Sequence, residues 1–254
     1  MKTRNRRPVL GGFGKAVEGA VSLNFGSSSG VNCDRSACPH HRRSTIPGGL
    51  RQCYATSTQA QIDRRQLQAK LSRHSHTDPA RIVNQALAEM QSRESVPWLR
   101  ISSFGSVPMP AVARENREFL TNLRRMFQWA SNMGIPAHFP AEGFAKARFY
   151  RALVGDLATV RESCATDRRF IRAKGAVSVV AGRPGTKLRE RIAAARELAR
   201  RRREASGRKA IVCPAIANTF ASKHKASRAN GRAKCGNCTA CAESHVDVVY
   251  PFHK

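Results

Sequence analysis

The stretch "AVSVVAGRPGTKLRERIAAARELARRRREASGRKAIVC", residues 176–213, decides the fold class. It opens with the apolar run AVSVVA and closes with KAIVC, and both are short and contain β-branched residues, as strands do. Between them, apolar side chains recur at helical spacing, at Leu188, Ile192, Ala195 and Ala199. A strand, an amphipathic helix and a second strand in this order are typical of a parallel α/β sheet.

The same alternation runs along most of the chain. Further strands are expected at 20–25, 97–102, 135–139, 156–162 and 246–250, and further helices at 80–91 and 112–130. We therefore predict a single α/β domain over residues 1–254, built as a partial or complete parallel (β/α) barrel. Cysteine-rich loops would lie at the carboxyl ends of its strands, where such folds carry function. These are an N-terminal cysteine loop at 26–56 and a C-terminal cysteine-rich segment at 209–254.

The eight cysteines fall into groups. One group is Cys33, Cys38 and Cys53; the other is Cys213, Cys235, Cys238 and Cys241; Cys164 stands alone. The charged N-terminus, interrupted by Lys15 and Glu18, does not have the pattern of a secretory signal, so we expect a cytoplasmic protein. Thiols in a reducing compartment rarely form a disulfide framework, so grouped cysteines indicate metal or cluster ligation.

The C-terminal group has the spacing C-x2-C-x2-C within "KCGNCTACAE", residues 234–243. A zinc site usually takes cysteines in separated pairs, whereas three in one tight loop suit the corners of a cuboidal cluster. Cys213, followed by Pro214, would be the remote fourth ligand, as a Cys-Pro closes the bacterial ferredoxin motif. We predict an iron–sulfur cluster, [4Fe–4S], with one or two per chain; zinc held by four cysteines and free thiols stay open as alternatives.

The N-terminal group has the spacing C-x4-C, then fourteen residues, then Cys53. In one interpretation a further donor completes a structural site; the candidates are His40, His41 and Cys164. In the other, a three-cysteine cluster leaves one iron open, as in radical S-adenosylmethionine enzymes. The spacing differs from the C-x3-C-x2-C typical of those enzymes, so the enzyme hypothesis is the weaker alternative here.

The charge of the chain points to a polyanionic partner. Lys and Arg number 45 against 17 Asp and Glu, a formal net charge of +28. Nucleic acid, DNA or RNA, would screen this charge; a membrane surface, or an arginine bias without function, are the alternatives. No run of eighteen apolar residues predicts a membrane-spanning helix.

The densest basic segment is 187–209, with ten Lys or Arg and three Glu, a local net of 10 − 3 = +7. We expect it to contact phosphates rather than base edges, because no base-reading motif accompanies it. The candidate residues are Arg196, Arg200, Arg201, Arg202, Arg203, Arg208 and Lys209. A solvated helix face is the alternative.

Several short motifs together resemble the phage "gene product 88" family of cysteine-rich proteins. They are "CPHH", "CYA", "WLRISSFGS", "CGNCTACAE" and "VVYPFH", and the resemblance extends from about Ser22 to His253. The family's cysteine blocks correspond to Cys33, Cys38, Cys53 and Tyr54, and to Cys213, Pro214, Cys235, Cys238 and Cys241.

The resemblance implies a cysteine-rich α/β protein of a phage or plasmid that ligates iron–sulfur clusters and has no settled activity. We expect it to serve a phage or plasmid process such as replication, maintenance or modification. Gly105-Ser106 departs from the family, which often carries an acidic residue after that glycine. A catalytic role is therefore in doubt.

Overall fold

The computed structural model describes residues 10–13, 17–23, 78–101, 107–108, 110–182, 185–213, 240–241 and 243–251. The strands are β1 (Leu10–Phe13), β2 (Val17–Leu23), β3 (Leu99–Ile101), β4 (Ala137–Glu142), β5 (Thr159–Ser163), β6 (Val177–Ala181), β7 (Lys209–Val212) and β8 (Val246–Pro251). The helices are α2 (Pro79–Gln91), α3 (Pro110–Glu115), α4 (Arg117–Asn132), α5 (Gly143–Val154), α6 (Asp167–Arg172) and α7 (Leu188–Ser206). Within these residues, none of the helices is both long and apolar enough to span a bilayer.

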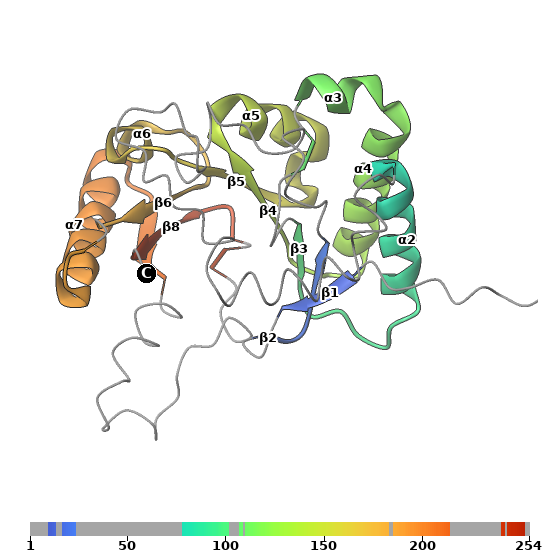
Figure 1. Ribbon diagram of the computed structural model, residues 1–254, viewed down its shortest axis with the longest axis horizontal. Helices are drawn as coiled ribbons and strands as arrows, with labels where there is room; N and C mark the ends of the chain where they lie inside the picture. The colour runs from blue at the N-terminus through green and yellow to red at the C-terminus, as the bar shows by residue number, and fades with distance from the viewer. Residues whose placement is uncertain are drawn as a thin grey trace, which may run out of the picture.

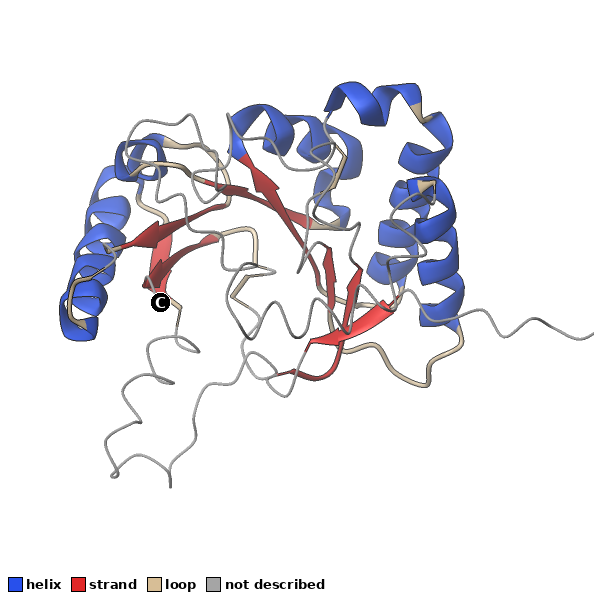
Figure 2. Ribbon diagram, viewed as in Figure 1, coloured by secondary structure: helices blue, strands red, loops and turns tan. Residues whose placement is uncertain are grey.

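The strands form one sheet in the order β1-β2-β3-β4-β5-β6-β8-β7. β1 and β2 are antiparallel, and every other neighbouring pair is parallel. The sheet curves into an arch, with the helices along its outer side (Figures 1 and 2). The α/β class and the parallel sheet are thus confirmed, while closure into a barrel stays a prediction.

β8 interrupts the otherwise sequential strand order. The chain passes from β6 through α7 to the edge strand β7, and β8 then enters the gap between β6 and β7. A strand that pairs on both sides and is covered on both faces usually has a nearly continuous apolar sequence. The sequence of β8, VDVVYP, follows this pattern apart from one aspartate. This insertion brings the C-terminal segment into the middle of the sheet.

All seven predicted strands are present, and so are the predicted helices, with one correction. The helix expected at 112–130 is two helices, α3 and α4, separated at Asn116. The Asn116 side chain accepts a hydrogen bond from the Phe119 N–H at 2.9 Å and so caps α4. β1, α5 and α6 were not predicted.

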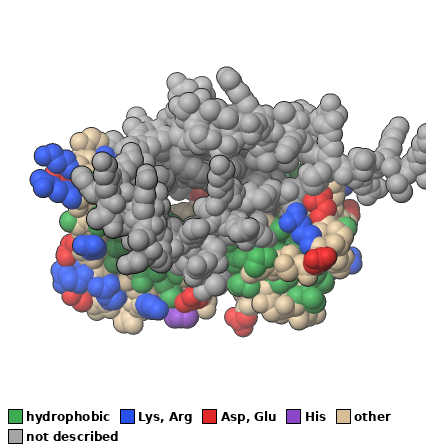
Figure 3. Space-filling model, turned by 90° about the horizontal axis from the view of Figure 1, so that it is seen from below, with side chains coloured by type: hydrophobic (Ala, Val, Ile, Leu, Met, Phe, Trp, Pro, Cys, Tyr) green, Lys and Arg blue, Asp and Glu red, His purple; other side chains and the backbone are tan. Residues whose placement is uncertain are grey.

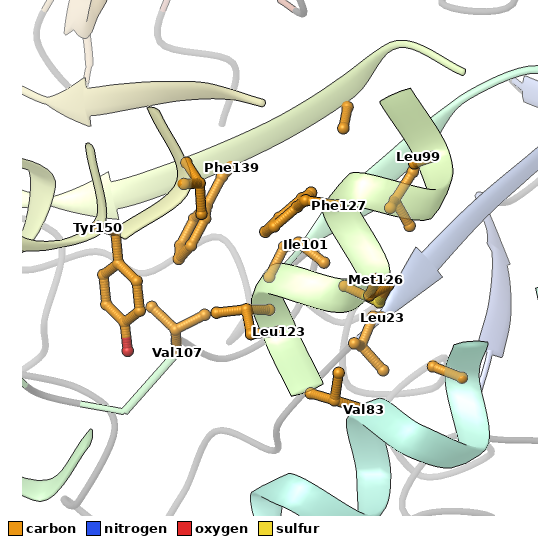
Figure 4. Packing of buried hydrophobic residues seen from close by; sticks show 14 of the residues in the cluster. Leu23, Val83, Leu99, Ile101, Val107, Leu123, Met126, Phe127, Phe139 and Tyr150 are labelled. Atoms are coloured by element: carbon orange, nitrogen blue, oxygen red, sulfur yellow. The ribbon is translucent and has the colours of Figure 1, made fainter. Parts of the chain in front are cut away.

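The larger apolar core lies between the outer face of β2–β5 and helices α2, α4 and α5. In Figure 4, Phe127 of α4 lies close to Ile101 and Phe139 of the sheet, and Met126 of α4 lies close to Leu23. Each of these side chains is fully buried. A smaller core packs α6 and α7 on β6, β7 and β8. Both helix layers therefore cover the same side of the sheet and leave its concave side to other residues.

Candidate functional site

Side chains alternate between the two faces of each strand, and this alternation separates the residues of the outer core from those of the concave face. In β8, Val249 packs with α6 and α7 in the outer core, whereas Val246 and Val248 belong to a cluster on the concave face. That concave cluster also holds Cys213 and Cys241. Two of the four predicted C-terminal ligands, 28 residues apart in sequence (241 − 213), thus meet on one face.

Cys213 directly follows β7 and continues its pairing with β8. Its N–H donates to the Val249 carbonyl at 2.8 Å, and the residue is 8 % exposed. The backbone of Cys213 is therefore fixed by the sheet, at the carboxyl end of β7. The wider expectation, that the cysteine-rich loops gather at the carboxyl ends of the strands, stays a prediction.

Cys241 lies in the segment that covers this face. Its Sγ atom is 3.1 Å from the Tyr250 hydroxyl oxygen. Burial, and then the neighbouring Cys241 thiol, raise the pKa of Tyr250 well above its usual value. The two groups are within hydrogen-bonding distance, so this contact joins β8 to the segment that carries Cys241.

Arg161, from the middle of β5, anchors the segment that carries Cys241. The residue is 0 % exposed, and its guanidinium donates to backbone carbonyl oxygens at 2.6–3.3 Å; these belong to Val177, Ala240, Cys241, Glu243 and Val246. No carboxylate forms an ion pair with Arg161 within the described residues. The positive charge is therefore offset there only by carbonyl dipoles, and an anionic centre beside it would be stabilised.

Two sulfur donors, from Cys213 and Cys241, fit a sulfur-ligated centre on this face. Cys241 is the last cysteine of the C-x2-C-x2-C motif. The other predicted ligands fall outside the described residues: Cys33, Cys38, Cys53, Cys235 and Cys238, with His40 and His41. Accordingly, the described part of the chain contains no group of three or more Cys, His, Asp or Glu side chains able to hold a metal.

Cys164 lies on the opposite face of the sheet from Cys213 and Cys241. It is buried in the outer core beside Phe170, with its sulfur 3.8 Å from the Glu162 Oε1 atom. Glu162 accepts two hydrogen bonds from Arg169, at 2.7 and 2.9 Å. Burial, and then the Glu162 carboxylate, raise the pKa of Cys164 far above its usual value, so the thiol stays protonated. Cys164 is thus separated from the C-terminal centre by the sheet.

The predicted basic surface belongs to α7 and the start of β7, but its arginines are not alike. Arg196, Arg200, Arg201, Arg203 and Lys209 are exposed. Lys and Arg side chains gather at the end of the molecule that α7 forms (Figure 3). Arg200 pairs with Glu197 and Glu204, and Arg203 donates to the Ala210 carbonyl. Arg196 and Arg201 make no ion pair within the described residues, and their charges are the most available.

Arg202, one of the predicted phosphate contacts, is buried. It is 0 % exposed and donates through Nε to the Asp247 Oδ2 atom at 2.8 Å, and Asp247 is equally buried. Arg208 binds the same oxygen at 3.0 Å, and Asp247 also accepts the Val177 N–H. Arg202 therefore does not face solvent, and Arg208 is half-buried with its charge already paired.

This network joins α7 to β8 and fixes which side of α7 is exposed. Arg202 also donates to the carbonyl oxygens of Ile171 and Ala173, at the end of α6. One buried side chain therefore connects two helices and the sheet. The exposed arginines of α7 project from a helix whose rotation is set by this contact.

Replacing Arg202 with Ala should destabilise the protein by about 3 kcal/mol, because it removes buried hydrogen bonds and leaves the half-buried Arg208 to offset the charge of Asp247. Arg201→Ala, on the exposed side of the same helix, should change the stability by less than about 0.5 kcal/mol. Urea unfolding followed by circular dichroism measures both. Equal stability of the two variants would contradict the buried network.

Sequence reasoning did not find Arg161, Tyr250 or the polar residues Arg100 and His138 on the concave face. Arg161 lies in the short strand TVRES. A charged residue inside a predicted strand was the sequence feature that could have identified it. A buried charge in a strand is costly unless it is paired or hydrogen-bonded, so it commonly marks a special contact.

Comparison of the chain with profiles of known protein families, with curated proteins and with solved structures finds no match.

Arg161→Lys should release the segment that carries Cys241, because one ammonium cannot reach the carbonyl oxygens that the guanidinium fork binds. We expect a loss of stability of about 3 kcal/mol. Alkylation of Cys241 in the native protein, followed by mass spectrometry, should become about tenfold faster as local opening becomes easier.

Arg151→Lys is the matched control. Arg151, on α5, likewise donates to backbone carbonyl oxygens, those of Val160, Lys174 and Ala176. Its loss should lower the stability without a matching effect on Cys241. If both variants expose Cys241 equally, Arg161 has no special hold on the cysteine segment.

Proposed function

We propose that this protein binds an iron–sulfur cluster, [4Fe–4S], on the concave face of its sheet and associates with nucleic acid through α7. The cluster ligands would be Cys213, Cys235, Cys238 and Cys241. The observation that carries the proposal is the meeting of Cys213 and Cys241 beside Arg161 and Tyr250. Two sulfurs from distant parts of the chain share a small apolar cluster next to a buried positive charge.

Iron–sulfur ligation is favoured over zinc by the spacing of the cysteines. Three thiols at successive steps of three residues suit separate iron corners, with a remote fourth from the end of β7. Four thiolates make either centre anionic, so the charge of Arg161 supports both. Metal analysis must therefore distinguish an iron–sulfur cluster from a zinc ion at this site.

The nucleic-acid part of the proposal rests on the exposed cations Arg196, Arg200, Arg201, Arg203 and Lys209. They lie along one helix and the strand that follows it, an arrangement that suits phosphates spaced along a backbone. With Arg202 buried and Arg208 paired, contacts would be fewer than the sequence alone predicts.

The biological setting comes from the resemblance to the gene product 88 family and stays a prediction. It would be a phage or plasmid process in the cytoplasm, such as replication, maintenance or modification of nucleic acid. The partial or complete barrel belongs to the same proposal, with the cluster at its carboxyl face. A second cluster, or an open iron as in S-adenosylmethionine enzymes, would depend on Cys33, Cys38 and Cys53.

Anaerobic purification followed by iron, sulfide and zinc analysis tests the cluster. Wild type should contain about four irons and four sulfides per cluster with a brown colour. Cys213→Ser and Cys241→Ser should each contain about four irons and four sulfides fewer than wild type. Zinc in place of iron and sulfide would replace the proposal with the zinc alternative.

Cys164→Ser is the matched control, since Cys164 lies on the other face of the sheet. It should keep the full iron and sulfide content. If Cys164→Ser loses as much iron as Cys213→Ser, the loss reflects unfolding or a different ligand set, and the proposed site is wrong.

The double variant Arg196→Ala/Arg201→Ala tests the basic surface. If both residues contact phosphates, the slope of log affinity against log salt should fall in magnitude by about 2. Fluorescence anisotropy with labelled single- and double-stranded DNA and RNA across a salt series measures it.

Arg124→Ala/Arg125→Ala removes the same two charges from the exposed side of α4, at the opposite end of the molecule (Figure 1). This control should leave the slope nearly unchanged. Equal slopes for the two double variants would mean that binding follows net charge alone.

A further inference from the structure

Three consecutive strands place polar side chains on the concave face of the sheet. Leu99 and Ile101 pack in the outer core, so Arg100 between them projects from the other face. The same alternation places His138 of β4 between Ala137 and Phe139. Arg100 and His138 are direct partners across the β3–β4 pairing.

Arg161 adds a second positive charge to this group. It lies on β5, next to β4, and its charge acts on the ring of His138. Arg161 also donates to the Cys241 carbonyl oxygen, so the group lies beside the thiol cluster. The three side chains therefore form one polar patch, Arg100–His138–Arg161.

His138 is the unusual member of the patch. It is 2 % exposed, and neither ring nitrogen has a hydrogen-bond partner within the described residues. Its ring lies parallel to the Trp98 indole, with centroids 6.1 Å apart and an interplanar angle of 1°. Trp98 therefore covers the ring face, while both ring nitrogens are buried without a hydrogen-bond partner within the described residues.

Burial, and then the charges of Arg100 and Arg161, lower the pKa of His138 well below its ordinary value. The imidazole is neutral at pH 7, so one nitrogen carries a hydrogen and can donate. A buried donor left unsatisfied costs about 1–3 kcal/mol. A bound acceptor would recover this free energy.

The charge around His138 selects the kind of acceptor. On the same face of β4, two and four residues further on, lie Pro140 and Glu142, and Glu142 pairs with Lys146 at 2.9 Å. Arg161 has no carboxylate partner within the part of the chain that the structure describes. A neutral donor between two cations, with the nearby acid already paired, attracts an anion.

We propose that the Arg100–His138–Arg161 patch is a binding site for a small molecule that carries a carboxylate or phosphate group. The oxyanion would accept a hydrogen bond from the His138 ring and charge-assisted hydrogen bonds from Arg100, with Arg161 adding its field. Arg100 is the middle residue of the three-residue strand β3, and its partner His138 is the second residue of β4. This site does not depend on the cysteines holding a cluster.

Nuclear magnetic resonance of the full chain with ¹⁵N-labelled histidine tests the site. Sodium phosphate and sodium acetate are the two probes, each compared with sodium chloride at equal ionic strength. The His138 signals should move and saturate with phosphate, acetate or both, and not with chloride; the effective anion identifies the ligand group. If neither anion moves them beyond the effect of chloride, the proposal is wrong.

The His138 signals are identified by their loss in His138→Gln. If that variant does not fold, nuclear Overhauser contacts to the Trp98 indole identify them instead. Arg100→Gln should weaken the anion response about tenfold, because a hydrogen bond to a charged group is lost. Arg125→Gln, which removes an exposed charge from α4, should leave the response unchanged. Equal responses in Arg100→Gln and wild type would overturn the site.

The double variant Cys213→Ser/Cys241→Ser separates this proposal from the cluster. It should lose iron and sulfide and still show the anion response, since none of the three patch residues is a cysteine. Loss of the response in the folded double variant would show that the patch serves the thiol centre and is not a separate ligand site.

Discussion

The buried guanidinium of Arg161 is the constraint on which the concave face depends. It lies at the centre of the sheet on β5 and binds the backbone of the segment at 240–246, about eighty residues away in sequence. Without such an anchor, a short segment rich in small residues would have little apolar area to hold it on the sheet. A buried arginine satisfied by backbone carbonyls keeps its full charge, and this charge makes the same face attractive to anions.

The alternation of strand side chains explains how one sheet carries an apolar core and a polar face. Outer positions of β3, β4 and β5 supply Ile101, Phe139 and Val160 to the core. The positions between them carry Arg100, His138 and Arg161 on the concave face. Arg100 pairs directly with His138, and Arg161 lies on the next strand opposite Pro140, two residues beyond His138 on the same face of β4. The polar patch is therefore a direct result of three neighbouring strands that each place a polar residue on the concave face.

The sequence predicted the sheet well because its parallel strands are short apolar runs between clear breaks. It failed at β1, whose glycine-rich LGGF has little apolar character, and at α5, which begins directly after β4. It also joined α3 to α4, since the capping role of Asn116 is a local hydrogen bond that periodicity does not show. For the site, spacing alone grouped the cysteines, but only the strand order could place Cys213 beside Cys241.

The arginines show why charge predicted from sequence overstates an accessible surface. Arg151, Arg161 and Arg202 are all directed inward, to backbone carbonyls or to Asp247. Their charges stabilise the arrangement of α5, the C-terminal segment and α7, and contribute little to a phosphate-binding surface. The position of α7 depends on one of these inward arginines, Arg202, because its pairing with Asp247 of β8 sets the rotation of the helix. Consequently the exposed Arg196 and Arg201 are oriented by the same strand that brings Tyr250 to Cys241, and the basic surface and the thiol centre share β8 as their common support.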